Sequence, residues 1–153
     1  GFDLNIYLQG SYGQDIYNAN SLMFTQAIIR NTNFLSTVLD RWRTDRTPEE
    51  NAGATVRSMD DPTNVFTDQY VEDGSFLRLK TISLGYTFPV KLIRGIGVNK
   101  LRLYVTGQNL YTWTNYSGYD PEVSTRGSGL TQGVDYAGYP RSKTFIGGVS
   151  ISF

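Results

Sequence analysis

The 153-residue chain has no cysteine and no histidine. Catalytic triads that use these side chains, and zinc sites of the usual type, therefore cannot form within it. Fourteen basic and fourteen acidic residues cancel, so no excess charge points to nucleic acid. The carboxylate pairs Glu49–Glu50 and Glu72–Asp73 come with no nucleophile or base arrangement. We therefore expect no enzyme, no metal and no cofactor.

Long apolar runs are also missing, and none approaches the roughly 20 residues of a membrane-spanning helix. Aromatic residues make up 14% of the chain, with 11 Tyr and 16 Gly. This composition is common in β-rich chains, membrane barrels included, because half of each barrel strand faces water. The sequence therefore favours an all-β fold.

Four segments alternate apolar and polar residues, as strands with two unlike faces do. The expected strands cover about residues 2–13, 76–88, 101–113 and 143–153. At about 3.3 Å per residue and a tilt near 45°, a strand of some 11 residues rises about 25 Å, the height of a barrel's lipid-facing band. Strands of soluble sandwiches are usually shorter, so the length favours an antiparallel transmembrane barrel.

The strand at 101–113 carries aliphatic residues first and aromatic residues last. Its final rings, Tyr111 and Trp113, are expected to form an interface girdle where the strand leaves lipid. In the strand at 76–88, the apolar phase changes part of the way along. A one-residue bulge near Lys80–Thr81 would keep one apolar face, and the alternative is that Ile82 and Leu84 face a packed interior.

The connections between these strands are unequal in length. Residues 14–75 and 115–142 form two long loops, whereas 90–100 is a short turn. Barrels of the outer membrane have long extracellular loops and short periplasmic turns in this arrangement. Four strands cannot close a barrel, and an open sheet would expose two edges. We therefore expect the C-terminal portion of a larger barrel, with the true N-terminus elsewhere.

The first long loop is expected to contain short helices. Leu35, Val38, Leu39 and Trp42 have the spacing of an amphipathic helix, with Thr32 or Asn33 as its N-cap. Residues 21–29 are a second helical candidate. Asp60, Asp61 and Asn64 carry calcium-type oxygen ligands, but their spacing favours a turn, as does Asp120-Pro121-Glu122.

Loop aromatics are the candidate substrate contacts. Trp113, Tyr116 and Tyr119 could stack on sugar rings, because an aromatic face offers a broad apolar platform. The simpler interpretation is an interfacial girdle for Trp113 and packing within the loop for the two tyrosines.

Three blocks carry a family resemblance, and their order and spacing agree. They are VEDGSFLRLKTISLGYTFP (71–89), LRLYVTGQNLYTWTNYSGYDPEV (101–123) and YPRSKTFIGGVSISF (139–153). With LDRWRTDRTPEEN (39–51), they resemble the end of a SusC/RagA-type TonB-linked outer-membrane protein. The resemblance implies the last four strands of a 22-stranded barrel, whose N-terminal plug lies outside this chain.

The same resemblance implies a function. Such proteins import oligosaccharides or peptides across the outer membrane of Bacteroidetes-type bacteria, with energy delivered through TonB. A SusD-like surface lipoprotein covers the extracellular loops, and outer-membrane lipid surrounds the barrel. Barrels of this kind end in a strand that the assembly machinery recognises, and Gly148, Ile151 and Phe153 match that signal, while Ile146 departs from its usual polar position.

A second hypothesis belongs to another class of protein. The same strands would suit a soluble or surface-attached β-sandwich that binds glycans with its two long loops. In that case the apolar strand faces would be buried against a second sheet.

Overall fold

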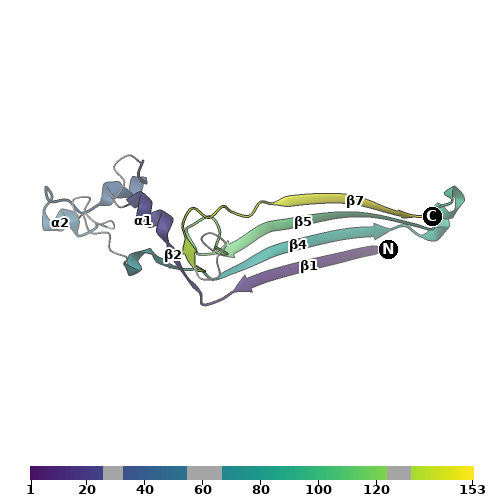
Figure 1. The fold of residues 1–153 in the computed structure, drawn as a ribbon, viewed down its shortest axis with the longest axis horizontal. Coiled ribbons are helices and arrows are strands. Elements are labelled where there is room, and N and C mark those ends of the chain that lie inside the picture. The colour runs from purple at the N-terminus through teal and green to yellow at the C-terminus, as the bar shows by residue number, and fades with distance from the viewer. Residues whose placement is uncertain (26–32, 55–66, 124–131) are drawn as a thin grey trace. The chain divides into compact units, whose positions relative to one another are not determined.

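The computed structural model describes residues 1–25, 33–54, 67–123 and 132–153 (Figure 1). The chain divides into two compact units. The sheet unit contains Gly1–Gly13, Gly74–Asn115 and Pro140–Phe153. The loop unit contains Gln14–Asp73 and Tyr116–Tyr139. The two long predicted loops therefore come together as one folded unit.

The sheet unit is an open antiparallel sheet of four strands in the order β1-β4-β5-β7. Their bounds lie close to the expected ones: β1 Phe2–Ser11, β4 Phe76–Thr87, β5 Lys100–Thr114 and β7 Thr144–Ser152. Within the described part of the chain, β1 pairs only with β4 and β7 only with β5. Both outer strands thus present a free edge, which proteins seldom leave uncovered.

The predicted bulge is confirmed at Lys80. Against β1, Leu79 pairs with Leu8 and Thr81 with Tyr7, so Lys80 is the extra residue. Against β5, the register shifts at the same place, between the pairs Leu79–Tyr111 and Thr81–Gln108. The irregularity on β5 includes Asn109 at φ 53°, a left-handed conformation that Asn adopts more readily than most residues.

The bulge gives the sheet one continuous apolar face. Leu77, before it, and Leu84, after it, are both exposed there, at 46% and 51%. Phe2, Leu4 and Ile6 of β1 are exposed at 79%, 62% and 52%. Val105 of β5 and Val149 of β7 are each 60% exposed. Exposed apolar area on this scale marks a surface that another phase or partner covers.

The connection from β4 to β5 is short and helical. It consists of α3 (Val90–Ile93) followed by the 3-10 turn η3 (Arg94–Ile96). Gly97 ends the turn at φ 75°, a conformation that costs glycine no steric penalty. Ile93 and Val98 are buried, at 4% and 8% exposure.

The loop unit has a second, three-stranded sheet in the order β3-β2-β6. Its elements are β2 Asp15–Asn18, α1 Ala19–Thr25, η1 Ser36–Asp40, α2 Pro48–Asn51, η2 Asp68–Tyr70, β3 Val71–Asp73 and β6 Val134–Asp135. The described core residues include Ile16, Leu22, Tyr70 and Tyr116, all at most 9% exposed. This unit is therefore packed in the manner of a water-soluble domain.

One helical prediction is confirmed over its described part, since α1 covers residues 21–25 of the candidate at 21–29. The other differs from the prediction. The stripe beginning at Leu35 is a five-residue 3-10 turn, and of its apolar residues only Val38 is buried. With three residues per turn, the spacing of an α-helical stripe does not form one face. Leu35 itself occupies the N-cap position, without a side-chain cap. Of the remaining expectations, Thr32 and residues 26–29 lie outside the described residues.

One helix was missed although its signal was present. Thr47 accepts a hydrogen bond from the Glu50 amide, and Glu50 accepts one from the Thr47 amide, which forms a capping box at the start of α2. The sequence Thr-Pro-Glu-Glu carries this pattern, with Pro48 at the first helical position. None of the described helices is both long and apolar enough to cross a membrane.

Candidate functional site

Aromatic rings stand at both ends of the apolar face. The predicted girdle pair, Tyr111 and Trp113, lies at the end from which the long connections leave, with ring centroids 4.9 Å apart. At the other end, the Tyr86 ring lies 4.6 Å from Phe2 and 4.9 Å from Phe88. This second group was not predicted, although its rings share the apolar register. Rings that bracket an aliphatic band are typical of a surface spanning a membrane.

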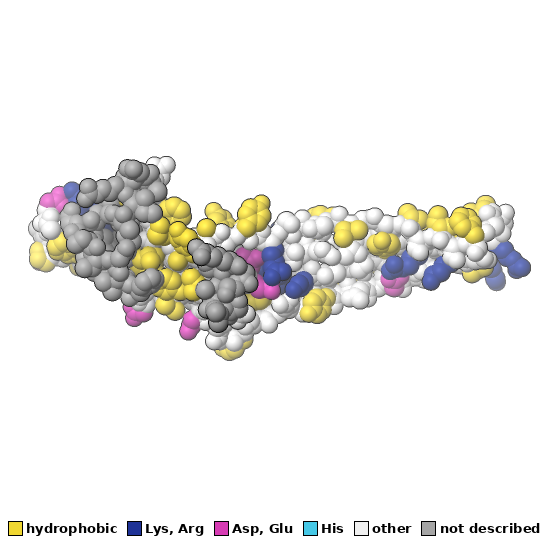
Figure 2. All heavy atoms as spheres, in the orientation of Figure 1, with side chains coloured by type: hydrophobic (Ala, Val, Ile, Leu, Met, Phe, Trp, Pro, Cys, Tyr) yellow, Lys and Arg dark blue, Asp and Glu magenta, His cyan; other side chains and the backbone are white. Residues whose placement is uncertain are grey.

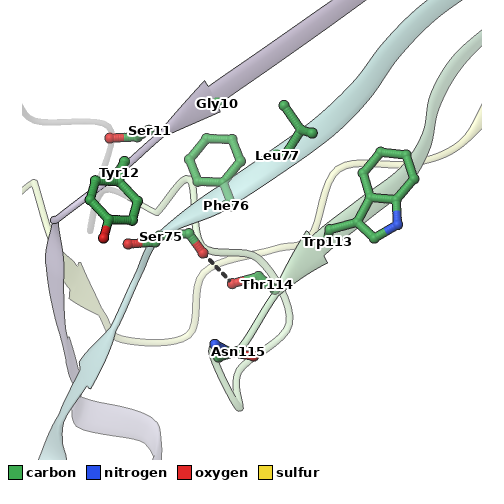
Figure 3. A pocket seen from close by; sticks show the side chains of 9 residues that line it. All are labelled: Gly10, Ser11, Tyr12, Ser75, Phe76, Leu77, Trp113, Thr114 and Asn115. Carbon is green, nitrogen blue, oxygen red and sulfur yellow. Dashed lines mark hydrogen bonds between the residues drawn. The ribbon is translucent and has the colours of Figure 1, made fainter.

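A groove of about 540 Å³ lies in the sheet unit where β1 and β5 end and β4 begins. Figure 3 shows its lining side chains, namely Gly10, Ser11, Tyr12, Ser75, Phe76, Leu77, Trp113, Thr114 and Asn115. The Thr114 hydroxyl donates to the Ser75 carbonyl at 2.8 Å, which ties the ends of β4 and β5 together. The lining combines rings with hydroxyl and amide groups, the mixture that binds sugars, peptides or lipid headgroups.

The opposite face of the sheet carries a row of contacts across all four strands, which we call the polar row. The Arg102 guanidinium of β5 reaches over Gly85 to Asp3 of β1, with Nη2 and Oδ2 2.5 Å apart. The Arg102 Cζ atom also lies 5.2 Å from the centroid of the Tyr104 ring. That ring in turn lies over Gly148 of β7.

The two glycines make the polar row possible. A Cβ added to Gly148 would stand 2.2 Å from Tyr104 Cζ, and one added to Gly85 would stand 2.4 Å from Arg102 Nη2. Gly147, the neighbour of Gly148, has nothing within 4 Å of such an atom. Gly148 therefore has a packing role in this sheet, beside the assembly role expected of it.

β4 also carries a buried cation near the groove, on the same face of the sheet as the polar row. Arg78 is 2% exposed and donates from Nε to the Thr112 hydroxyl at 3.0 Å. Its Cζ atom lies 5.6 Å from the centroid of the Phe76 ring. At the bulge, the Lys80 ammonium donates to the Gln9 side chain. These contacts satisfy cations that would otherwise be costly to remove from water.

The loop unit is held by a polar network around Glu72, which lies in β3. Glu72 accepts hydrogen bonds from the Asn18 side-chain amide at 2.8 Å and from the amide and hydroxyl of Ser117 at 2.9 and 2.8 Å. One carboxylate thus joins β2, β3 and the segment that follows β5. Charge-assisted bonds of this kind are among the stronger ones in proteins.

Tyr116 is part of the same folded unit, and the structure offers its ring no open face for a sugar. The side chain is 5% exposed, and its hydroxyl donates to the Asp135 carboxylate at 2.7 Å. Burial, together with this bond, raises the pKa of the Tyr116 phenol well above its usual range. The observed position favours packing within the loop, the simpler of the two interpretations.

The other two predicted substrate contacts have exposed side chains. Tyr119 is 84% exposed and Trp113 is 49% exposed, the latter on the apolar face and at the groove. Sequence reasoning overlooked Tyr12 and Tyr139, which are 96% and 94% exposed. Tyr12 falls within the first expected strand, but β1 ends at Ser11, and Tyr139 comes shortly before the last expected strand.

The three residues of the expected assembly signal occupy different faces of the last strand. Ile151 and Phe153 are exposed, at 51% and 83%, whereas Gly148 lies under the Tyr104 ring. Ile146, which departs from the pattern, pairs with Thr106 of β5 and is 40% exposed.

Several carboxylates of the described residues serve local structure. Glu50 caps α2, Glu72 organises the network, and Asp120 accepts from the Glu122 amide at 2.9 Å in the expected turn. In the described ranges, no three His, Cys, Asp or Glu gather as metal ligands. Asp60, Asp61 and Asn64 lie outside those ranges.

Comparison with known proteins gives a consistent picture. No family profile matches the sequence. TonB-dependent receptor P3 of Formosa agariphila is 34% identical over 99% of this chain and 15% of that protein. TonB-dependent receptor SusC of Bacteroides thetaiotaomicron is 36% identical over 57% of this chain and 8% of that protein. These proteins are named as receptors, not enzymes.

Solved structures agree with the sequence matches. The RagAB peptide transporter superposes with a TM-score of 0.81 at 26% identity, over 100% of this chain and 16% of that chain. The RagAB peptide importer in its open-open state gives 0.79 at 28% identity, with the same coverage. The chain thus spans about a sixth of the length of the proteins that match it over nearly its whole extent.

Proposed function

This chain is a relative of the SusC/RagA-type TonB-dependent receptors, and on that premise we propose that it supplies the last four strands of a 22-stranded outer-membrane barrel. The apolar face meets the lipid and the polar row faces the barrel interior. The free edges of β1 and β7 pair with strands outside this chain. Complete pairing satisfies the edge groups, which lipid cannot do.

The complete protein imports a nutrient across the outer membrane of a Bacteroidetes-type bacterium. The nutrient is an oligosaccharide or a peptide, and RagAB is named a peptide importer. A SusD-like lipoprotein covers the loop side. TonB acts through an N-terminal part with a plug, and the energy it delivers rearranges that plug.

Within this scheme, the described residues take separate roles. Tyr111 and Trp113 form the girdle at one membrane boundary, and Tyr119 is the candidate substrate contact. Gly148, Ile151 and Phe153 form the assembly signal. The groove beside Trp113 is a further place where a substrate or a lipid headgroup would bind.

The observation that carries the proposal is the exposure of the apolar face. In the alternative β-sandwich, Phe2, Leu4 and Val105 would be buried against a second sheet. Instead they are 79%, 62% and 60% exposed. Lipid is the solvent in which such a face is stable, and aromatic rings at both ends fit the two interfaces.

Fractionation of cells that express the intact gene product tests the proposal. We expect the product in the outer-membrane fraction, extracted by detergent only, with a gel mobility that changes on heating. A monodisperse species in plain buffer, or a 17 kDa soluble product, would contradict the barrel and favour the sandwich.

The substrate class needs a separate experiment. A deletion strain is grown on single nitrogen or carbon sources, either peptides or oligosaccharides of defined size. Loss of growth on one class, restored by the wild-type gene, identifies it. Normal growth on every source would contradict import of either class.

A further inference from the structure

The β4–β5 connection exposes apolar and cationic side chains together, and we call this set the turn patch. Val90, Leu92 and Ile96 are 54%, 72% and 73% exposed. Lys91, Arg94 and Lys100 are exposed beside them. Figure 2 shows the Lys and Arg side chains gathered at the end of the sheet that carries α3.

The exposed apolar residues are not needed for the packing of the connection, because other apolar residues of the connection are already buried. Ile93 and Val98 are buried and hold the connection against the sheet unit. Backbone bonds fix both of its ends: the Phe88 amide donates to the Leu101 carbonyl at 2.9 Å, and the Asn99 amide donates to the Ser152 carbonyl at 2.8 Å. The turn patch is thus presented on a rigid base.

The charged side chains of the β4–β5 connection are all positive. From Gly74 to Tyr119 the sequence contains no Asp or Glu. Asp3, the acidic residue on the neighbouring strand end, is engaged by Arg102. None of the turn-patch cations forms a salt bridge with a described residue. Three cations that pair with no described residue complement an anionic surface.

The turn patch also continues the apolar face. Tyr86 and Phe88, which belong to the aromatic group at this end, immediately precede Pro89 and α3. A boundary set by aromatic rings is where amphipathic side chains meet headgroups, with apolar parts inward and charges outward. The chain therefore passes from the lipid-facing surface directly into the turn patch.

We propose that the turn patch is an anchor for anionic phospholipid at the membrane boundary. Val90, Leu92 and Ile96 insert at the level where acyl chains meet headgroups. Lys91, Arg94 and Lys100 bind the phosphates of phosphatidylglycerol-type lipids. The proposal rests on the membrane placement proposed above, and it adds a lipid class and a site to it.

Lipid retention by the purified full-length receptor tests the charges. The receptor is exchanged into equal amounts of phosphatidylglycerol and phosphatidylethanolamine, and bound lipids are counted by native mass spectrometry. The double variant Lys91→Gln/Arg94→Gln should retain phosphatidylglycerol about 25-fold less, since each of the two cations near an anionic surface contributes about fivefold. Lys143→Gln, an exposed cation at the opposite end of β7, should change nothing. Equal retention by wild type and double variant overturns the proposal.

Spin labels test the depth of the apolar residues in vesicles of the same two lipids. Labels at Leu92→Cys and Ile96→Cys should be more accessible to oxygen than to a water-soluble nickel chelate. A label at Tyr139→Cys should show the reverse, because that residue is exposed in the loop unit. A label at Val105→Cys reports separately on the apolar face.

The two proposals fail in distinguishable ways. If Val105 is in lipid while Leu92 and Ile96 are in water, only the anchor is overturned. If Val105 is in water as well, the membrane placement itself is overturned. If both turn labels are shielded from both reagents, a protein covers the turn patch, and the anchor is again overturned.

Discussion

The sheet unit and the loop unit use their apolar residues in opposite ways. In the sheet unit, Phe2 and Leu4 lie in the open, and strand ladders with the polar row hold the strands together. In the loop unit, Ile16 is 1% exposed and Tyr70 is 4% exposed. On the membrane placement proposed above, one continuous chain contains a part built for lipid and a part built for water. The surrounding solvent, not overall composition, explains the difference.

The largest effect should come from a charge on the apolar face. Ile6→Arg places a guanidinium near the middle of the lipid-facing band and should cost about 2–4 kcal/mol of stability. Asn5→Arg, one residue earlier on the opposite face, is the matched control and should assemble normally. The folded fraction is measured by heat-dependent gel mobility and by urea unfolding in vesicles. Equal loss in both variants would contradict the assignment of the two faces.

The second-largest effect should come from disturbing the packing of the polar row. Gly148→Ala pushes a methyl group into the Tyr104 ring and should destabilise the sheet by about 1–3 kcal/mol. Gly147→Ala, with open space around it, should be neutral. Urea unfolding in vesicles measures both. In a Tyr104→Ala background, Gly148→Ala should no longer reduce stability. If that double variant still assembles poorly, the result would favour recognition of Gly148 by the assembly machinery.

In the loop unit, the corresponding test removes one buried hydrogen bond. Tyr116→Phe leaves the Asp135 carboxylate without its phenol donor and should cost about 1.5 kcal/mol, confined to this unit. Hydrogen exchange of residues 132–138 should accelerate while that of β4 and β5 stays unchanged. Faster exchange in both units would show that they unfold together.

The raised pKa of Tyr116 gives the same bond a pH signature. The contribution is fully present below the unfolded tyrosine value near 10 and is lost as pH rises through the higher folded value. Exchange in this segment should therefore show no Tyr116-dependent step from pH 6 to 9.

The smallest effect should come from the surface of the loop unit. The Arg43 guanidinium holds the pKa of the Asp45 carboxyl below its usual range. This exposed ion pair, 2.5 Å between Nη2 and Oδ2, contributes little because water and salt screen it. Asp45→Asn should leave proteolytic resistance unchanged above pH 4, where wild-type Asp45 is ionised. A marked loss would show that the pair organises the loop.

The sequence predicted the sheet better than the loop unit, for a physical reason. A strand with two unlike faces repeats every two residues, so alternation located all four strands, and the phase change located the bulge at Lys80. The matching irregularity at Asn109 has no such signal, because the apolar positions around it keep the same parity. The family resemblance, carried by quoted blocks, is confirmed by the TonB-dependent receptors that match.

The loop unit depends on pairings between distant segments. β2 pairs in parallel with β6, more than a hundred residues later, and no local pattern announces this. Tyr116 illustrates the consequence for the site: the sequence favoured packing within the loop, but nothing local indicated that its hydroxyl would meet Asp135. The 3-10 turn at Ser36–Asp40 shows that apolar spacing alone does not decide helix type.

The pairing of Asp15 with Asp73 has a consequence for the order of folding. Some sixty residues separate β1 from β4, and closing a free loop of that length costs chain entropy. Once β2 and β3 have paired, the loop leaves and returns at neighbouring positions, so the remaining closure is that of a short hairpin. The free-energy cost of closing the loop falls by about 1.5 kcal/mol, because closure entropy depends on the logarithm of loop length. Pairing of β2 with β3 thus brings the two ends of the loop together, and β1 should pair with β4 faster once β2 and β3 have paired.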